Sequence, residues 1–182
     1  VGKTTLIKKL NYQLKEHNII TNGFYTEEVR NDKGYRIGFD IVTLDGKRGK
    51  LARCLNETPS HQHTKFKLGQ YVVFTAEFEN LVLPLFKKKT EAMIIDEIGK
   101  MESFSQKFKN IMQAYYKKDN ILILATIPFR KTQIPFIEEI RDNSKAKLFI
   151  IMGYRSFLKR LQIQGAGFME DQSNRIKWHN AQ

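Results

Sequence analysis

The sequence contains almost no cysteine, since Cys54 is the single thiol in 182 residues. One thiol can form neither a disulfide framework nor a zinc site built from several cysteines. This composition favours a reducing compartment, and we expect an intracellular, cytoplasmic protein. The chain also lacks any apolar run near the roughly 20 residues that a membrane helix needs, and its N-terminus has no signal-peptide pattern. We therefore expect no membrane partner.

Acidic residues are in the minority. Lys and Arg number 31, Asp and Glu number 19, and the formal net charge is +12. A basic excess can indicate nucleic-acid binding, because Lys and Arg neutralise phosphates. Here the basic residues are spread along the chain, and the longest run, Lys87–Lys89, is typical of the solvated end of a helix. The charge therefore does not predict a nucleic-acid partner, and we expect one compact domain that acts as a monomer.

Hydrophobic spacing predicts helices and strands in alternation. Residues 3–16 carry leucine and isoleucine at helical intervals, which predicts an amphipathic helix. Residues 23–30 and 35–44 are rich in β-branched and aromatic residues and flank a turn at 31–34, which predicts a β-hairpin. The other expected elements are a strand at 48–54, a polar loop at 55–69, a strand at 71–74, a helix through 78–85 that Pro84 kinks or ends, a helix capped by Ser103 and Gln106, and a helix at 135–141.

Three short apolar runs have the pattern of strands that are buried on both faces of a parallel sheet. They lie at 92–95, 121–125 and 148–151. Such strands, alternating with amphipathic helices, predict an α/β domain with a mostly parallel sheet flanked by helices. We expect the antiparallel β-hairpin near 23–54 to be an insertion into this domain.

The first residues, Val1-Gly2-Lys3-Thr4, match the last four positions of the phosphate-binding loop G-x-x-x-x-G-K-[ST] at the start of a helix. In that loop the backbone N–H groups bind phosphate oxygens, the lysine reaches the β- and γ-phosphates, and the hydroxyl ligates Mg²⁺. The alternative is a chance Gly-Lys-Thr at a helix start. Because the match begins inside the motif, we expect that the first strand and the glycine-rich half of the loop are missing from this chain.

Two adjacent carboxylates follow the apolar strand at 92–95. Asp96 and Glu97 are expected at its C-terminal end, which is the edge where open α/β sheets bind ligands. There Asp96 would hold the Mg²⁺ shell, and Glu97 would activate the attacking water as a general base. The alternative is an acidic pair that begins a surface loop, but the four apolar residues before it favour the site.

Other side chains have weaker assignments. Thr126 follows the strand at 121–125 and is expected either to contact the γ-phosphate or the water, or simply to end the strand. The H-x-H pair His61 and His63 has no third ligand at a recognisable spacing, which favours a polar loop over a metal site. Four arginines are candidates for neutralising transition-state charge, and the sequence does not choose among Arg30, Arg36, Arg130 and Arg141.

Several longer stretches, in this order and spacing, resemble the cancer-related nucleoside-triphosphatase family. They are Gly23–Arg30, Arg36–Asp40, Gly69–Val73, Ile95–Glu102 and Thr126–Pro128. The resemblance spans residues 1 to about 151. It implies a small, RecA-like P-loop enzyme that hydrolyses several nucleoside triphosphates to the diphosphate and phosphate with Mg²⁺.

The resemblance also implies a set of site residues. The catalytic residues are Glu97 and Lys3, and the metal ligands are Thr4 and Asp96. The nucleotide-binding residues are Val1, Gly2, Lys3, Thr4, Thr5, Asp96, Glu97 and Gly99. We expect ATP, GTP, CTP and UTP all to be substrates, because nothing in the sequence addresses a base. The alternative functions are a nucleotide or nucleoside kinase, which uses the same groups with a second substrate, and a nucleotide switch or basic nucleic-acid adaptor without turnover.

The resemblance divides the chain into two parts. Residues 1–152 are expected to form the P-loop domain without its first strand, and residues 153–182 are expected to be a divergent tail that is disordered or forms a short helix near 157–161. A missing central strand predicts an unpaired sheet edge. We therefore expect the chain as it stands to be less stable than one that includes this strand and to have little or no hydrolytic activity.

Overall fold

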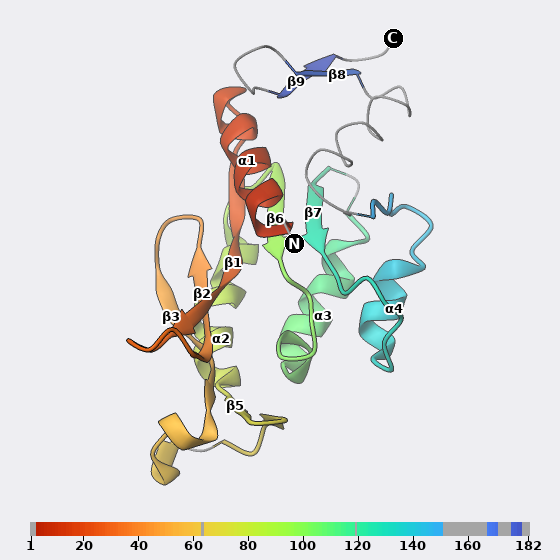
Figure 1. Cartoon of the computed structure of the whole chain (residues 1–182). Coiled ribbons are helices and arrows are strands. Elements are labelled where there is room, and N and C mark those ends of the chain that lie inside the picture. Colours follow the sequence, from red (N-terminus) through yellow and green to blue (C-terminus); the bar gives the residue numbers. More distant parts are fainter. Residues whose placement is uncertain (1–2, 63, 119, 151–166, 171–175, 180–182) are drawn as a thin grey trace.

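A seven-stranded mixed sheet with helices on both faces forms the body of the protein (Figure 1). The computed structural model describes residues 3–62, 64–118 and 120–150, together with the backbone of 167–170 and 176–179. In chain order the main elements are α1 (Lys3–Glu16), β1 (Thr21–Arg30), β2 (Arg36–Thr43), β3 (Arg48–Cys54), β4 (Lys67–Leu68), β5 (Tyr71–Val73), α2 (Thr75–Val82), β6 (Ala92–Asp96), α3 (Gln106–Tyr115), β7 (Leu122–Thr126) and α4 (Pro135–Arg141). Short 3₁₀ turns are η1 (Leu55–Glu57), η2 (Ser60–Gln62), η3 (Leu83–Lys87) and η4 (Glu102–Phe104).

The sheet has the strand order β4-β5-β3-β2-β1-β6-β7. The pairs β1/β6 and β6/β7 are parallel, whereas the other pairs are antiparallel. The predicted antiparallel hairpin is confirmed, and its first strand, β1, also belongs to the parallel part of the sheet. Residues 21–25 of β1 pair with β6. Strand β1 has ten residues and β6 has five, so β1 extends beyond β6, and residues 24–30 pair with β2. The antiparallel strands thus extend the parallel sheet.

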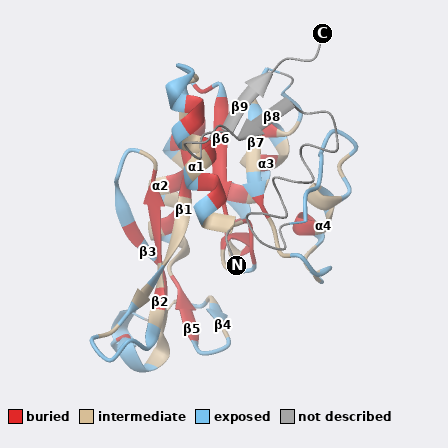
Figure 2. Ribbon diagram, turned by 45° about the horizontal axis from the view of Figure 1, so that its top comes forward, coloured by how far each residue is buried: buried red, intermediate tan, exposed pale blue. Residues whose placement is uncertain are grey.

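Strand β6 is buried along its whole length, as its apolar pattern predicts (Figure 2). Its side chains alternate between two cores, because successive residues of a strand point to opposite faces. Ala92 and Ile94 pack with Ile7 and Leu14 of α1. Met93 and Ile95 belong to the larger cluster, which includes side chains of α2, α3 and α4. The sheet therefore lies between two helical layers.

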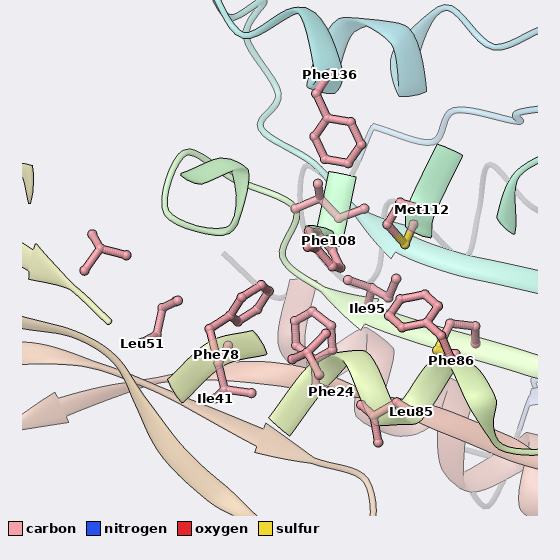
Figure 3. Close-up of a cluster of buried hydrophobic side chains, with 14 of the residues drawn as sticks. Phe24, Ile41, Leu51, Phe78, Leu85, Phe86, Ile95, Phe108, Met112 and Phe136 are labelled. Carbon is pink, nitrogen blue, oxygen red and sulfur yellow. The ribbon is translucent and has the colours of Figure 1, made fainter. Parts of the chain in front are cut away.

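Phenylalanine dominates the larger core. The ring of Phe108 on α3 has its centroid 6.0 Å from Phe24 of β1, 5.2 Å from Phe78 of α2, 6.2 Å from Phe86 of η3 and 6.2 Å from Phe136 of α4 (Figure 3). All four contacts are edge-to-face, an arrangement that aromatic quadrupoles favour. One residue therefore joins four other elements.

Strands β1 and β6 approach each other closely at Gly23. This glycine has a φ of 143°, and a Cβ at its position would lie 1.8 Å from the carbonyl oxygen of Ile94. Only a residue without a side chain fits this contact.

The strand predicted at 148–151 is wrong for its described part. Residues 148–150 are irregular, and Leu148 and Ile150 are 55% and 45% exposed, while residue 151 lies outside the described residues. An apolar run becomes a strand only where a neighbour completes its hydrogen bonds. The described sheet ends at β7, whose first four residues are themselves exposed or half-buried rather than buried on both faces.

Local signals had mixed outcomes. Helix α2 gives way to the 3₁₀ turn η3 around Pro84, as predicted. The loop predicted at 55–69 contains two 3₁₀ turns and the short strand β4. The cap predicted at Ser103 is wrong. Helix α3 is capped by Ser105, whose side chain accepts a hydrogen bond from the Phe108 N–H, because the Ser103 hydroxyl is bonded to Gly99 instead.

A separate antiparallel pair, β8 (Gly167–Glu170) and β9 (Ile176–His179), occurs in the C-terminal part. The short helix expected near 157–161 falls outside the described residues. Across the described chain, no helix combines the length and the apolar character needed to cross a membrane.

Candidate active site

Polar residues form a row at the C-terminal edge of the parallel strands. Tyr25 of β1, Asp96 of β6 and Thr126 of β7 lie side by side in register. The Thr126 hydroxyl donates a 2.7 Å hydrogen bond to Oδ1 of Asp96, which is 2% exposed. In the described chain Oδ2 of Asp96 has no such partner. Thr126 therefore orients the carboxylate and leaves its second oxygen available.

The first turn of α1 lies at the same edge (Figure 1). The Lys3 ammonium is 3.8 Å from Oε1 of Glu97, and the two side chains are 36% and 45% exposed. The first turn contains no acidic residue, so the positive end of the helix dipole is not neutralised within its own helix. An exposed ion pair at this distance is weak, and an anion with more charge can replace it. The two motifs, far apart in the sequence, meet here.

The other predicted phosphate-binding residues are placed less completely. Thr4 is half-buried and Thr5 is exposed, both beside Lys3, and no hydrogen bond joins either to Asp96. Gly99 is buried in the loop after β6. Val1 and Gly2 lie outside the described residues.

The protein offers few ligands for a metal ion. Among the described residues, no three or more His, Cys, Asp or Glu side chains gather closely enough to hold a metal. His61 is exposed on η2, and its predicted partner His63 lies outside the described residues. Mg²⁺ commonly keeps waters and substrate phosphates with only one or two protein ligands. The available oxygen of Asp96 and the hydroxyl of Thr4 fit that pattern, whereas a site built from protein ligands alone does not.

A carboxylate without a predicted role lies behind Glu97. Glu102 is 3% exposed, and its Oε2 accepts a 2.9 Å hydrogen bond from the Gly99 N–H. Burial, followed by the charges of Glu97 and Asp96, raises the pKa of Glu102 to about 7. The sequence signal for it is an acid three residues after a glycine, a spacing that allows this side chain to close a turn on the glycine N–H.

Three of the four candidate arginines have structural partners. Arg30 and Arg36 both form ion pairs with Glu28. Arg141 pairs with Glu138 and donates hydrogen bonds to the carbonyl groups of residues 128, 129 and 130.

In the described chain, the Arg130 side chain has no ion pair. It lines a cavity of about 700 Å³ together with Leu68, Lys100, Ser103, Phe104, Pro128, Lys131, Thr132, Gln133 and Ile134.

A network of ion pairs connects the antiparallel strands to α1. The sequence did not predict it. Arg48 of β3 pairs with Asp40 of β2 at 2.9 Å and with Glu27 of β1, and Glu27 also pairs with Lys8 of α1 at 3.1 Å. The hydrogen bond from Arg48 is the largest of the effects that lower the pKa of Glu27. Four elements thus contribute to the network, and β3 contributes two residues, because Arg53 also pairs with Asp40. Strand pairing was required to see this, because the residues are widely spaced in the sequence.

Comparisons with known proteins identify the family to which the chain is similar. A family described as NTPase matches residues 1–156. The human "Cancer-related nucleoside-triphosphatase" is 43% identical over 157 residues, which cover 82% of this chain and 82% of the human protein. "Nucleoside-triphosphatase THEP1" of a Thermotoga species is 40% identical over 152 residues, or 82% of this chain and 79% of that protein.

Two solved structures are similar over most of the chain. A solution structure of a human cancer-related nucleoside triphosphatase has a TM-score of 0.73 and 38% identity, and covers 93% of this chain and 94% of its own. The crystal structure of THEP1 from Aquifex aeolicus has a TM-score of 0.67 and 36% identity, and covers 82% of this chain and 83% of its own. The mixed sheet flanked by helices is therefore a P-loop NTPase fold, as the sequence predicts.

Proposed function

Because the chain belongs to the NTPase family, whose relatives above are named as hydrolases, we propose that it hydrolyses nucleoside 5′-triphosphates to the diphosphate and phosphate, with Mg²⁺ and with little discrimination between bases. The observation that carries the proposal is the 3.8 Å contact between Lys3 and Glu97, beside the buried carboxylate of Asp96. A phosphate-binding lysine and a carboxylate able to reach water lie together, next to a carboxylate suited to Mg²⁺. The names of the relatives support water, rather than a second substrate, as the phosphate acceptor.

When the nucleotide binds, its triphosphate replaces the Glu97 carboxylate as the anion paired with Lys3. The triphosphate lies at the N-terminus of α1, where Val1, Gly2, Lys3, Thr4 and Thr5 contact its oxygens. The Lys3 ammonium leaves its ion pair with Glu97 and binds the β- and γ-phosphates. Glu97 is then freed for the attacking water, and the backbone of Gly99 approaches the phosphate end of the same site.

Thr4 and Asp96 would hold Mg²⁺. The Thr126 hydrogen bond engages one oxygen of Asp96, so the other oxygen would serve as the ligand. When bound, Mg²⁺ supplies positive charge that offsets the negative charge on the phosphate oxygens.

In the chemical step, the water oxygen forms a bond to the γ-phosphorus, and the bond from that phosphorus to the oxygen bridging the β- and γ-phosphates breaks. Glu97 takes the proton from the water as general base, and its half-exposed side chain leaves room for this water. Lys3 neutralises charge on the transferred group. The products are the nucleoside diphosphate, phosphate and one proton.

Steady-state phosphate release from ATP, GTP, CTP and UTP tests the function. Every predicted contact addresses phosphate or metal, so we expect slow turnover of all four, with kcat/KM values within about thirtyfold of one another, or about 2 kcal/mol. A preference above about a thousandfold, roughly 4 kcal/mol, contradicts broad specificity. Lack of turnover for all four nucleotides in a protein with a complete phosphate-binding loop contradicts the hydrolase itself.

Two variants separate the roles of the paired side chains. We expect Glu97→Gln to lower kcat by about a hundredfold or more while nucleotide affinity stays within about threefold, because only the general base is removed. Lys3→Ala removes a phosphate contact and should weaken nucleotide binding as well. An equal loss of affinity in both variants would show that Glu97 has been assigned the wrong role.

A further inference from the structure

The loop that carries Glu97 is fastened at Gly99 from both sides. The Gly99 N–H donates to Oε2 of Glu102 at 2.9 Å, and the Gly99 carbonyl accepts from the Ser103 hydroxyl at 2.6 Å and from the Ser103 N–H at 3.2 Å. Gly99 is buried, so these bonds satisfy polar groups that water does not reach. Both residues that hold Gly99 belong to the single turn η4.

The burial of Glu102 is costly and is not offset by a cation. A carboxylate is rarely buried fully unless a positive group pairs with it, because its charge loses hydration. In the described part of the chain no lysine or arginine pairs with Glu102, and the nearby charges that act on it are those of Glu97 and Asp96. An apolar side chain would fill this position at lower cost, so the carboxylate calls for an explanation beyond packing.

Glu97 and Glu102 differ in their access to solvent. The side chain of Glu97 is 45% exposed, whereas Glu102 is 3% exposed. Water therefore reaches Glu97, while Glu102 contacts the loop from its buried side. A Cβ at Gly99 would lie 3.0 Å from Oε2 of Glu102 and 3.5 Å from Oε1 of Glu97, so the two carboxylates approach the same glycine closely.

We propose that Glu102 is a positioning residue, which holds Gly99 and thereby fixes the loop that aims Glu97 at the attacking water. The proposal rests on the proposed role of Glu97 as general base. Glu102 itself touches neither substrate nor water. Its hydrogen bond restrains the residue two positions after Glu97, and removing it lets the exposed side chain of Glu97 sample orientations in which it does not accept the proton.

The first test is steady-state hydrolysis of Mg²⁺-ATP by Glu102→Ala and Glu102→Gln. We expect Glu102→Ala to lower kcat by about tenfold or more while nucleotide affinity stays within about threefold, because the phosphate contacts are unchanged. Glu102→Gln retains an oxygen that accepts the Gly99 N–H, so its kcat should stay within about threefold of the wild type. The matched control is Glu91→Ala. Glu91 also accepts a backbone N–H, from Ile20 at 2.7 Å, but at the opposite end of β6, and its loss should leave kcat unchanged.

The second test asks whether Glu102 acts through Glu97. Single-turnover phosphate release, with protein in excess, is measured for Glu102→Ala in the wild-type and Glu97→Gln backgrounds. A positioning residue has no further effect once the side chain that it positions has lost its function, so the double variant should match Glu97→Gln alone. An equal loss in both backgrounds, or wild-type kcat in Glu102→Ala, overturns the proposal.

Two controls keep the result decisive. If a wild-type protein with a complete phosphate-binding loop releases no phosphate, the proposed function fails. If that protein turns over and Glu102→Ala matches it, the positioning role alone fails. Should Glu102→Ala not fold, Ser103→Ala removes the other side-chain bond to Gly99 and leaves the buried carboxylate in place. We expect its kcat to fall by about threefold or more, since the Ser103 N–H still holds the carbonyl, and a wild-type kcat would overturn the proposal.

Discussion

Glu102 combines deep burial with two neighbouring carboxylates, Glu97 and Asp96, so that its protonation contributes to the free energy of folding. Burial raises its pKa from the ordinary 4.5 to about 7, with smaller contributions from Glu97 and Asp96. Between these values the folded protein keeps a proton that the unfolded chain has released. The folded state therefore loses stability as pH rises from about 4.5 to 7, and the loss is complete above that range.

Replacing Glu102 by glutamine should remove this pH dependence. We expect the free energy of unfolding of the wild type to fall, relative to Glu102→Gln, by at most about 3 kcal/mol between pH 4.5 and pH 8. Urea unfolding of both proteins across this range measures the difference. Glu91→Gln, which alters an exposed carboxylate, should follow the wild-type curve. Parallel curves for the wild type and Glu102→Gln would contradict the assigned pKa.

For single residues, the sequence predicts a functional role where the residue belongs to a recognisable motif. It does not predict a role that depends on burial of the side chain. Lys3, Asp96 and Glu97 stand at fixed positions relative to a helix start or a strand end, and the structure places Lys3 beside Glu97. Glu102 lies in the same family-like stretch as Asp96. Its position three residues after Gly99 does not reveal that its carboxylate is buried, because burial depends on distant parts of the chain.

Among the elements, α3 shows how one hydroxyl can serve two partners. The Ser105 oxygen accepts the Phe108 N–H at 3.0 Å, capping the helix, and its hydrogen is donated to Oε1 of Glu79 on α2 at 2.7 Å. The cap therefore also fastens α3 to its neighbour. The helix start is set by this pair of bonds rather than by the Ser103 and Gln106 pattern, which spacing alone favoured.

Ser105→Ala should destabilise the protein by about 1 to 2 kcal/mol, because a helix N–H loses its partner and Glu79 loses a donor. Thermal or urea unfolding measures the change. Ser60→Ala is the matched control, since Ser60 is exposed, and it should alter stability by less than about 0.5 kcal/mol. Equal stability of the two variants would show that the cap contributes little.

Element type is predicted well where local pattern and tertiary surroundings agree. The runs at 92–95 and 148–151 look alike in sequence, yet only the first is a buried strand, because β1 and β7 flank it. The sequence likewise did not predict that β1 pairs with strands on both of its sides. Its residues predict a strand and a hairpin, but not the parallel pairing of its first half with β6, which joins segments about seventy residues apart.

Across the whole molecule, Phe108 is the point where the layers on one side of the sheet meet. Its ring is fully buried and contacts aromatic rings from β1, α2, η3 and α4. A cavity at this point would remove contacts from all of these elements at once. Such a cavity should therefore lower the stability of the whole described domain, which unfolds cooperatively, rather than that of one helix.

Phe108→Ala is expected to lower the free energy of unfolding by about 3–5 kcal/mol, the range for truncating a fully buried phenylalanine. Urea unfolding gives the value, together with a slope that should match the wild type if unfolding remains cooperative. Phe129→Ala makes the same chemical change at a side chain that is 70% exposed, and should cost less than about 0.5 kcal/mol. Similar losses in both variants would contradict the central place of Phe108 in the core.

The close approach at Gly23 has a consequence for inherited variation. Every single-base change in a glycine codon that substitutes another amino acid adds at least a Cβ, and here that atom would lie 1.8 Å from the Ile94 carbonyl oxygen. Any such allele would force β1 away from β6, the strand that ends in Asp96. No missense change at this codon is therefore expected to leave the sheet edge that carries Asp96 undisturbed.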